Sequence, residues 1–502
     1  MPQQHLPDHP DLTPLRREAK SLRDRVRDAD PEAITTVHEH HPAPRIAPED
    51  EPGGTGFRLA DAQLTVARSY GFRSWPALRR HVDQVHRLTR RPHLAAACTG
   101  TDELLRLACL DYGTDRRSDR EEAARRLAAD PALAGASLCT AAAFGDLAAA
   151  RAILAVDPGA VSREDGPFRW PPLLYLAYSR TCISAPGADG AGHLAVARLL
   201  ITHGADPNAG FLWDGMTSPF TALTGAFGGG EQAAPPHPDE LPLARLLLGA
   251  GAEPNDNQTI YNRGAGDRLV RDDTEFLELL LAAGLGRGDG GPWHRLLAPR
   301  HPAPTQIVAD ALQHAAEKGL PRRLTLLLEH GVDPDRGSTH PLHHGRTPYE
   351  GAVLHGNAAA VELLAAAGAD TSGAGPLEQL VGACLSGDRD AALRAAADDA
   401  LLRTLLTRHR DLVARAAVLG RPNAVRLCLD LGSDIDALTG TTALHEAAVR
   451  GEESVVELLL ELGADPGILD ASHRAPAAAW ARHGGHDRLA ERLDTVAGRA
   501  VP

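Results

Sequence analysis

One phrase recurs along the 502-residue chain, and this repetition limits the possible folds more than any other feature. In each copy an apolar helical run ends at a glycine, which is followed by Ala, Val or Ser and then by an acidic residue. The copies are Val196–Asn208, Ala244–Asn255, Leu324–Pro334, Val361–Asp370, Val425–Asp434 and Val456–Pro466, with a degenerate one at Phe276–Gly284. A chain built this way is expected to stack small similar units.

Glycine punctuates each copy at the same place. The turn glycines are Gly204, Gly251, Gly284, Gly331, Gly368, Gly432 and Gly463, and most steps are about 33 or about 47 residues. Glycine at this point predicts a helix that ends in the left-handed conformation, which costs other residues energy. A following Asp-Pro pair prevents the helix from continuing.

A shorter helix is predicted before each phrase. The clearest example is Thr442–Gly451, followed by Thr347–Asn357, with looser versions at Ser137–Asp146 and Val413–Arg421. Thr at the start can cap the free N–H groups of the helix, and small Ala residues allow neighbouring helices to approach closely. Pro376–Ala397 reads as helix, turn, helix and fills the double step before Gly432.

The segment TALHEAAVRGEESVVELLLELGADP, starting at Thr442, resembles an ankyrin repeat. The resemblance extends over Ala136–Ala497 and implies antiparallel helix pairs with projecting turns, stacked into a curved solenoid with a concave binding face. Between Trp170 and Thr305 the copies carry long insertions, and Ala475–Ala497 has the polar replacements expected of a terminal cap.

The front of the chain differs from the repeats. LADAQLTVARSYGFRSWPALRRHV, starting at Leu59, resembles a helical module found at the front of bacterial ankyrin-repeat proteins. The predicted organisation is a disordered tail (1–14), an N-terminal helical module (15–91), a helical linker or N-cap (92–135) and the ankyrin-repeat array (136–497). The predicted class is an all-α ankyrin-repeat solenoid with irregular middle repeats, preceded by this small module.

Charge and cysteine usage restrict the setting. A net charge of −14 argues against a nucleic-acid partner, which needs basic surface. Apolar stretches are shorter than the roughly 20 residues that span a membrane, and no secretory signal is recognisable at the N-terminus. Six widely spaced cysteines without paired spacing favour a reducing compartment. We therefore expect a cytoplasmic protein that binds neither nucleic acid nor membrane.

No motif predicts catalysis. The glycine-rich Gly284–Pro292 follows a helix rather than the strand that a dinucleotide loop requires. Two histidine groups lack further ligands at zinc-site spacing and are interpreted as loop residues: His38, His40 and His41, and His340, His343 and His344. His445 is expected to bond to neighbouring backbone. The prediction includes no catalytic, cofactor-binding or metal-binding residue, and no cofactor.

The long insertions are the strongest candidates for function. They occupy residues 211–220, 228–240, 261–271 and 286–305, and they hold many of the few aromatic residues. Insertions in repeat arrays often lie on the binding face, and aromatic and Arg side chains supply much interface energy. The partner-binding candidates are Trp213, Asp214, Phe220, Tyr261, Arg263, Trp293 and His294. The same rings could instead pack back onto the repeats.

The leading hypothesis is a scaffold that binds an unidentified protein partner through the concave face and finger turns of the array. One alternative is an enzyme or small-molecule-binding protein with an aromatic pocket built from the insertions. A second alternative is an intramolecular or homotypic role, in which the N-terminal helices dock on the array.

Overall fold

The structure is a computed structural model that describes residues 6–7, 9–43, 56–96, 98–182, 192–230, 234–264, 271–339, 343 and 345–500. These residues form 28 α-helices, three 3-10 helices and one three-stranded sheet. The chain divides into two compact units. The first unit contains residues 1–270 and 278–307, and the second contains residues 271–277 and 308–502.

Four helices open the first unit: α1 (Leu12–Arg27), α2 (Pro31–His40), α3 (Leu59–Ser69) and α4 (Trp75–Leu88). Helix α3 packs against the other three, and Ser74 caps α4 as expected, accepting a hydrogen bond from the Ala77 N–H. Residues 12–14, expected in the disordered tail, belong to α1, and Leu6 is buried against Leu15, Phe72 and Leu78.

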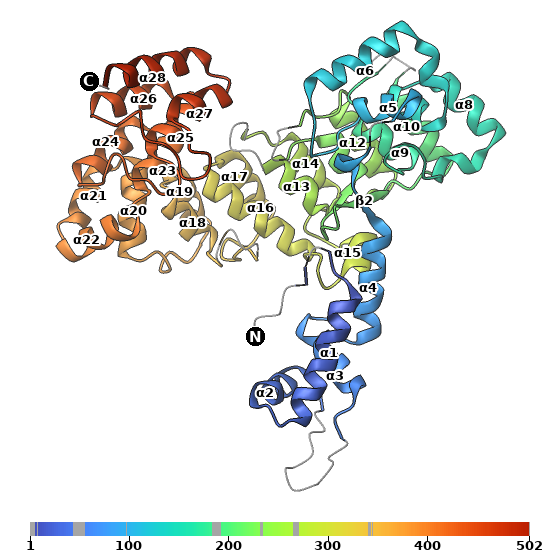
Figure 1. Ribbon diagram of the computed structural model, residues 1–502, viewed down its shortest axis with the longest axis horizontal. Helices are drawn as coiled ribbons and strands as arrows, with labels where there is room; N and C mark the ends of the chain where they lie inside the picture. Colours follow the sequence, from blue (N-terminus) through green and yellow to red (C-terminus); the bar gives the residue numbers. More distant parts are fainter. Residues whose placement is uncertain are drawn as a thin grey trace. The chain divides into compact units, whose positions relative to one another are not determined.

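Short helix pairs form the rest of the first unit (Figure 1). Helices α7, α9, α11 and α13 pack in series, and α8, α10 and α12 form a second series beside them. The bounds are η1 (Pro92–Leu94), α5 (Gly100–Ala108), α6 (Arg117–Ala129), η2 (Pro131–Gly135), α7 (Leu138–Phe144), α8 (Leu147–Val156), η3 (Pro158–Ser162), α9 (Pro172–Tyr178), α10 (His193–Thr202), α11 (Ala222–Phe227), α12 (Glu240–Gly249), α13 (Asn257–Gly264), α14 (Glu275–Ala282) and α15 (Gly291–Leu297).

The scarce aromatic residues gather in the first unit. Trp170, Tyr175 and Tyr178 are fully buried, and the Trp170 ring lies 4.9 Å from those of both Tyr178 and Phe211. The Tyr178 hydroxyl donates to the Thr221 carbonyl at 2.9 Å, so its one polar atom is satisfied inside the core. Large rings thus fill the space left between irregular helix pairs.

A small sheet modifies the predicted all-α class. Strand β2 (Gly210–Trp213) pairs antiparallel with β3 (Pro219–Thr221), so these strands form a hairpin from the first predicted insertion. On its other side β2 pairs in parallel with β1 (Thr89–Arg90), which directly follows α4. The chain remains mostly helical, but one insertion supplies a sheet that ties α4 to the repeats.

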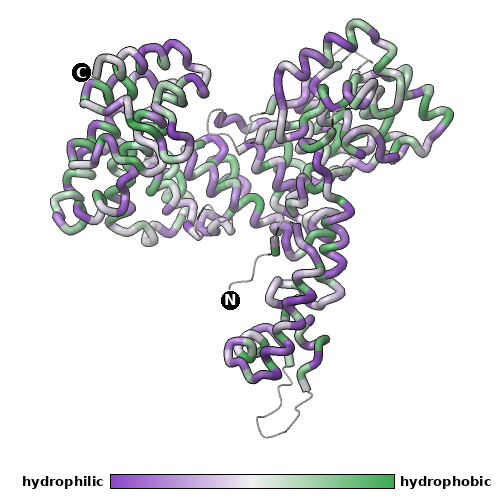
Figure 2. Tube along the Cα trace, in the orientation of Figure 1, coloured by the Kyte–Doolittle hydropathy of each residue, from purple (hydrophilic) through white to green (hydrophobic). Residues whose placement is uncertain are grey.

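The second unit continues the helix pairs. Helices α18, α20, α23, α25 and α27 pack in series, and one apolar cluster runs from Leu354 to Leu493. The bounds are α16 (Pro304–Lys318), which begins in the first unit, α17 (Pro321–Glu329), α18 (Pro348–Leu354), α19 (Ala358–Ala366), α20 (Pro376–Ser386), α21 (Arg389–Ala396), α22 (Asp399–Arg408), α23 (Leu412–Val418), α24 (Pro422–Asp430), α25 (Ala443–Arg450), α26 (Glu453–Glu461), α27 (Ala477–His483) and α28 (Asp487–Ala500). Figure 2 shows hydrophobic and hydrophilic residues alternating along these helices, as expected of helices with one buried face.

The predicted turn glycines are confirmed. Every one of them has a positive φ between 77° and 108°: Gly204, Gly251, Gly284, Gly331, Gly368, Gly432 and Gly463. Pro376–Ala397 also forms the predicted pair, α20 and α21, although α22 then occupies the place of a projecting turn. None of the helices in the described ranges combines the length and apolar character needed to cross a bilayer.

Candidate functional site

Two neighbouring loops of the second unit project from the helix pairs and are called here the finger turns: residues 431–442, between α24 and α25, and residues 462–476, between α26 and α27. Each is shaped by an aspartate near its start. Asp434 accepts the N–H of Asp436 at 3.0 Å, and Asp465 accepts the N–H of Gly467 at 2.8 Å. These bonds fold the backbone into an Asx turn in both loops.

Hydrogen bonds join the two finger turns to each other. The Asp465 N–H donates to Asp436 Oδ1 at 3.0 Å, and the Ala471 N–H donates to the Gly440 carbonyl at 2.8 Å. Inside the second turn, Asp470 accepts the N–H groups of Ser472, His473 and Ala475. These bonds, led by that from His473, hold the pKa of Asp470 well below its usual range. The paired turns therefore form one hydrogen-bonded surface.

The finger turns expose leucines: Leu438 in the first, and Leu462 and Leu469 in the second. Leu438 lies four residues after Asp434 and is 43% exposed, and Leu469 lies four residues after Asp465 and is 40% exposed. Leucine side chains are normally buried, and two at equivalent positions of linked loops give a small apolar surface. The same loops carry Asp434, Asp436 and Asp465, and the second also carries an exposed arginine, Arg474.

Helix α25 follows the first finger turn, and polar side chains at its start are held by hydrogen bonds. Thr442 caps the helix together with His445, whose Nδ1 lies 2.8 Å from the Thr442 hydroxyl and whose Nε2 lies 3.0 Å from the Ala475 carbonyl. The structural role predicted for His445 is confirmed. Glu446 accepts from the Thr441 hydroxyl at 2.7 Å and pairs with Arg450 at 2.6 Å, which fixes a half-buried charge pair beside the turns.

The region that contains most of the finger turns matches a known protein family. Residues 381–470 match the family model described as "Ankyrin repeats (3 copies)". This region carries ankyrin repeats. The match begins within α20 and ends at Asp470. It therefore includes the whole first finger turn and the part of the second that contains Leu469. No curated protein matches the chain.

Helix pairs outside the matched ankyrin repeats use the same loop-to-loop bond. Asn208 Oδ1 accepts the N–H of Glu253 at 2.8 Å, and Asn255 Oδ1 accepts the N–H of Gly286 at 2.8 Å. In the second unit, Asp335 does the same for Asp370 at 2.7 Å. In each case the accepting residue is the second after the acidic residue of the repeated phrase. The same bond therefore occurs in both units.

The predicted binding residues of the first insertions lie around the sheet. Trp213 ends β2, stacks on His93 with ring centroids 4.3 Å apart, and donates its indole N–H to the Asp111 carbonyl at 2.7 Å. Phe220 lies in β3 and is 3% exposed. Trp293 is 8% exposed and donates to the Asn208 carbonyl at 2.9 Å. These three rings pack against other residues of the first unit.

Of the other four predicted residues, Tyr261 is exposed and Asp214, Arg263 and His294 are half-buried. Tyr261, on α13, is 42% exposed, and Arg263 pairs with Glu240 at 3.4 Å. Asp214 follows β2 with a φ of 45° and accepts from Arg91 Nε at 2.7 Å. His294 lies on α15 with its ring 5.8 Å from that of His301. Residues 231–233 and 265–270 of the predicted insertions lie outside the described residues, and a binding role for this set stays a prediction.

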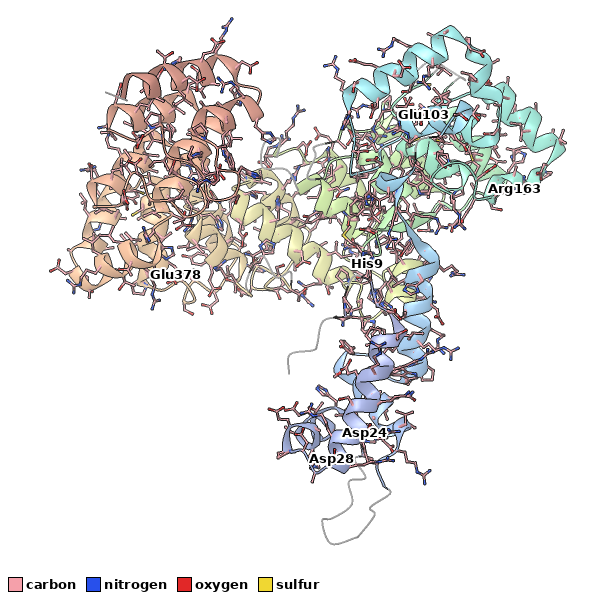
Figure 3. All side chains as sticks on the ribbon, in the orientation of Figure 1. His9, Asp24, Asp28, Glu103, Arg163 and Glu378 are labelled. Atoms are coloured by element: carbon pink, nitrogen blue, oxygen red, sulfur yellow. The ribbon has the colours of Figure 1, made fainter. Side chains whose placement is uncertain are left out.

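A cavity of about 450 Å³ lies beside β1 in the first unit. Its lining comes from the N-terminal segment, the end of α4 with β1, and the turn before α9: His9, Val85, His86, Thr89, Arg90, Arg91, Pro92, Pro167, Phe168 and Arg169. Figure 3 labels His9 among the side chains of this part of the chain. Among the described residues, the lining contains arginines and histidines but no carboxylate and none of the predicted aromatic residues.

Three residues of the first unit come close enough to be tested as a metal site. His193, His237 and Asp239 each offer a ligand atom within 4.8 Å of the other two. The His237 Nδ1 accepts the Asp239 N–H at 2.9 Å, which places the proton of the neutral ring on Nε2 and leaves no free lone pair on that ring. His193 Nε2 is bonded to the Ala143 carbonyl at 2.8 Å. The arrangement therefore suits packed neutral imidazoles better than metal ligands.

Several of these groups have only a weak signal in the sequence. Leu438 and Leu469 each lie four residues after a repeat aspartate. This equivalence becomes visible only when the repeats are aligned with each other. The arginines of the cavity are scattered over 80 residues and carry no motif. In the second histidine group, His340 and His344 lie outside the described residues, and His343 Nδ1 lies 2.9 Å from the Glu317 carboxylate.

Proposed function

We propose that the chain is a scaffold that binds a partner protein through the finger turns and the adjoining concave face of an ankyrin solenoid. Ankyrin repeats are in general protein–protein interaction modules, and residues 381–470 carry three of them. The observation that carries the proposal is the pair of exposed leucines, Leu438 and Leu469, on finger turns that are hydrogen-bonded to each other.

Rigid presentation makes this surface suited to binding. The bond from Asp465 to Asp436 and that from Ala471 to Gly440 hold the two turns together. A surface that is already ordered loses little conformational entropy when a partner binds. Leu438 and Leu469 then supply an apolar centre that loses water on contact, which is the usual source of affinity at the middle of an interface.

Charge indicates the kind of partner. The finger turns carry three accessible aspartates, Asp434, Asp436 and Asp465, against one exposed arginine, Arg474, and the whole chain has a net charge of −14. A partner with apolar side chains flanked by Lys or Arg would complement this surface, and the attraction would speed association at low salt. We place the interaction in the cytoplasm, which agrees with six cysteines that are all free.

The test is co-purification from the native host with a surface variant. The double variant Leu438→Gln with Leu469→Gln replaces the apolar pair by polar side chains of similar length. We expect it to lose partners that the unchanged chain captures, with affinity falling at least tenfold because an apolar contact centre carries much of the binding energy.

Leu393→Gln is the matched control. Leu393 is 45% exposed on α21, outside the finger turns, and this variant makes one of the two exposed Leu-to-Gln changes that the double variant makes. Partners captured by the unchanged chain and by Leu393→Gln but not by the double variant support the proposal. Equal capture by all three proteins contradicts it. Thermal melting of each variant checks that the second unit is still folded.

A further inference from the structure

The cavity beside β1 concentrates positive charge in an acidic protein. Arg90, Arg91 and Arg169 line it together with His9 and His86, and none of its lining residues in the described part of the chain is a carboxylate, although Glu164 pairs with Arg90 and Asp214 with Arg91 and His9 just outside it. The chain as a whole has 66 Asp and Glu residues against 52 Lys and Arg. A cavity of about 450 Å³ is also within the size range of small-molecule sites.

The fold brings the arginines together from two separate segments. Arg90 donates from Nη2 to Glu164 at 2.6 Å and from Nε to the Arg169 carbonyl at 3.3 Å, so it anchors the turn that carries Arg169. The Asp214 N–H donates to the Arg90 carbonyl at 2.9 Å, which continues the β1–β2 pairing. Arg90 thus acts as a positioning residue with its own charge largely neutralised.

Two guanidinium groups keep donors available. Arg91 uses Nε for Asp214 and is 52% exposed, so its terminal nitrogens can reach a ligand. The Arg169 guanidinium is exposed and has no hydrogen bond or ion pair with the residues that the structure describes. His9 lies 3.6 Å from Asp214 and adds a third donor at the rim. Arginine forks match the oxygens of a phosphate group.

Backbone strain surrounds the same cavity. Arg169 has a φ of 53° and Asp214 a φ of 45°, both in the left-handed region that non-glycine residues avoid. Asp214 orients Arg91, and Arg169 lines the cavity itself. Strain of this kind persists where the surroundings enforce it and is frequent at ligand sites.

We propose that this cavity binds a small organic phosphate monoester. The phosphate dianion would be held by the guanidinium groups of Arg91 and Arg169, with His9 as a further hydrogen-bond donor, because two cations from different segments favour a doubly charged group. Val85, Pro92 and Pro167 give the apolar part of the lining against which the organic group would pack. The site is separate from the finger turns, so it adds to the proposed partner binding and does not depend on it.

The test is isothermal titration calorimetry on the full chain, with phenyl phosphate as the probe. We expect phenyl phosphate to bind, and benzoate and inorganic phosphate each to bind at least tenfold more weakly, since the first lacks the second charge and the other lacks the organic group. If benzoate binds with equal affinity, the site does not require a doubly charged group, and the proposal is contradicted. Equal affinity for inorganic phosphate contradicts the organic part of the ligand.

Two substitutions at one position test the assignment of residues. Arg169→Gln and Arg169→Gly should each weaken phenyl phosphate binding at least tenfold, and the glycine variant is expected to fold well because glycine adopts the left-handed conformation without cost. The control is Arg163→Gln, which removes an exposed arginine six residues away that pairs with Asp157 at 2.8 Å. Unchanged affinity in both Arg169 variants, or equal loss in the Arg163 variant, overturns the proposal.

Discussion

Single side chains in the loops hold successive repeats together. In four repeats the second residue after the acidic position accepts a backbone N–H from the next loop, through Asn208, Asn255, Asp335 and Asp436. Asparagine and aspartate serve equally, because both present an Oδ1 acceptor at the same distance from the backbone. The bond therefore depends on an oxygen at this point and not on a charge.

The hydrogen bond accepted by Asp436 predicts the effect of two changes at this position. Asp436→Ala removes the acceptor for the Asp465 N–H and should lower the free energy of unfolding by about 1 kcal/mol. Asp436→Asn keeps the acceptor and should change it by less than about 0.5 kcal/mol. Urea denaturation of the full chain measures both. Equal destabilisation by Ala and Asn would show that charge, not the hydrogen bond, matters here.

Backbone conformation at the turn glycines is a second property of single residues. Gly463 has a φ of 94°, and a Cβ added there would meet no atom within 4 Å. Gly463→Val should therefore lower the melting temperature of the second unit through backbone strain alone, at a cost of about 1–2 kcal/mol. Gly463→Asn is the control and should cost less, because asparagine tolerates the left-handed region. An unchanged melting curve for the valine variant contradicts the assignment.

At the scale of elements, α4 contributes a buried titratable group to the first unit. His81 is 2% exposed, packs 4.9 Å from the Phe72 ring, and has no hydrogen-bond partner for either ring nitrogen among the described residues. Burial, with a further contribution from the positive charge of Arg300, lowers the pKa of His81 from 6.5 to about 4. The folded protein thus holds this imidazole neutral.

The sign of the pH effect follows from that shift. Between pH 6.5 and about 4 the unfolded chain binds a proton at His81 that the folded chain does not, so stability is full above pH 6.5 and falls as the pH drops toward 4. The loss is at most about 3 kcal/mol. His81→Phe removes the titration and should flatten the dependence, as measured by urea denaturation at pH 7.5, 6, 5 and 4. An equally steep loss in the variant contradicts this role.

Local pattern was enough to predict some elements and not others. The repeated phrase located the helix pairs and the left-handed glycines because helix periodicity and glycine turns are properties of adjacent residues. The sheet was not foreseen, since Thr89 pairs with Leu212 and nothing near either residue records that contact. For the same reason the cavity, which joins residues 9, 85–92 and 167–169, had no sequence signature.

The insertions illustrate the limit for binding residues. The sequence showed that the insertions hold many of the aromatic residues. It allowed two roles for these rings, packing onto the repeats or binding a partner. Phe220 and Trp293 pack into the first unit, whereas Tyr261 stays 42% exposed. Which ring is buried depends on the tertiary arrangement around β2 and β3, so only the structure separates the two uses.

At the scale of the whole molecule, the two units carry different kinds of surface. The second unit has the ankyrin-repeat match and the linked finger turns with Leu438 and Leu469. The first unit has the sheet, the buried aromatic core and the arginine-lined cavity. We infer a chain that recognises a protein with one unit and a small anion with the other.

Hydrogen–deuterium exchange of the full chain, with and without its captured partner, tests the central claim most directly. We expect binding to slow exchange in residues 431–442 and 462–476, where backbone N–H groups of the finger turns would be shielded. Slower exchange confined to the first unit, with both finger turns unchanged, would contradict it.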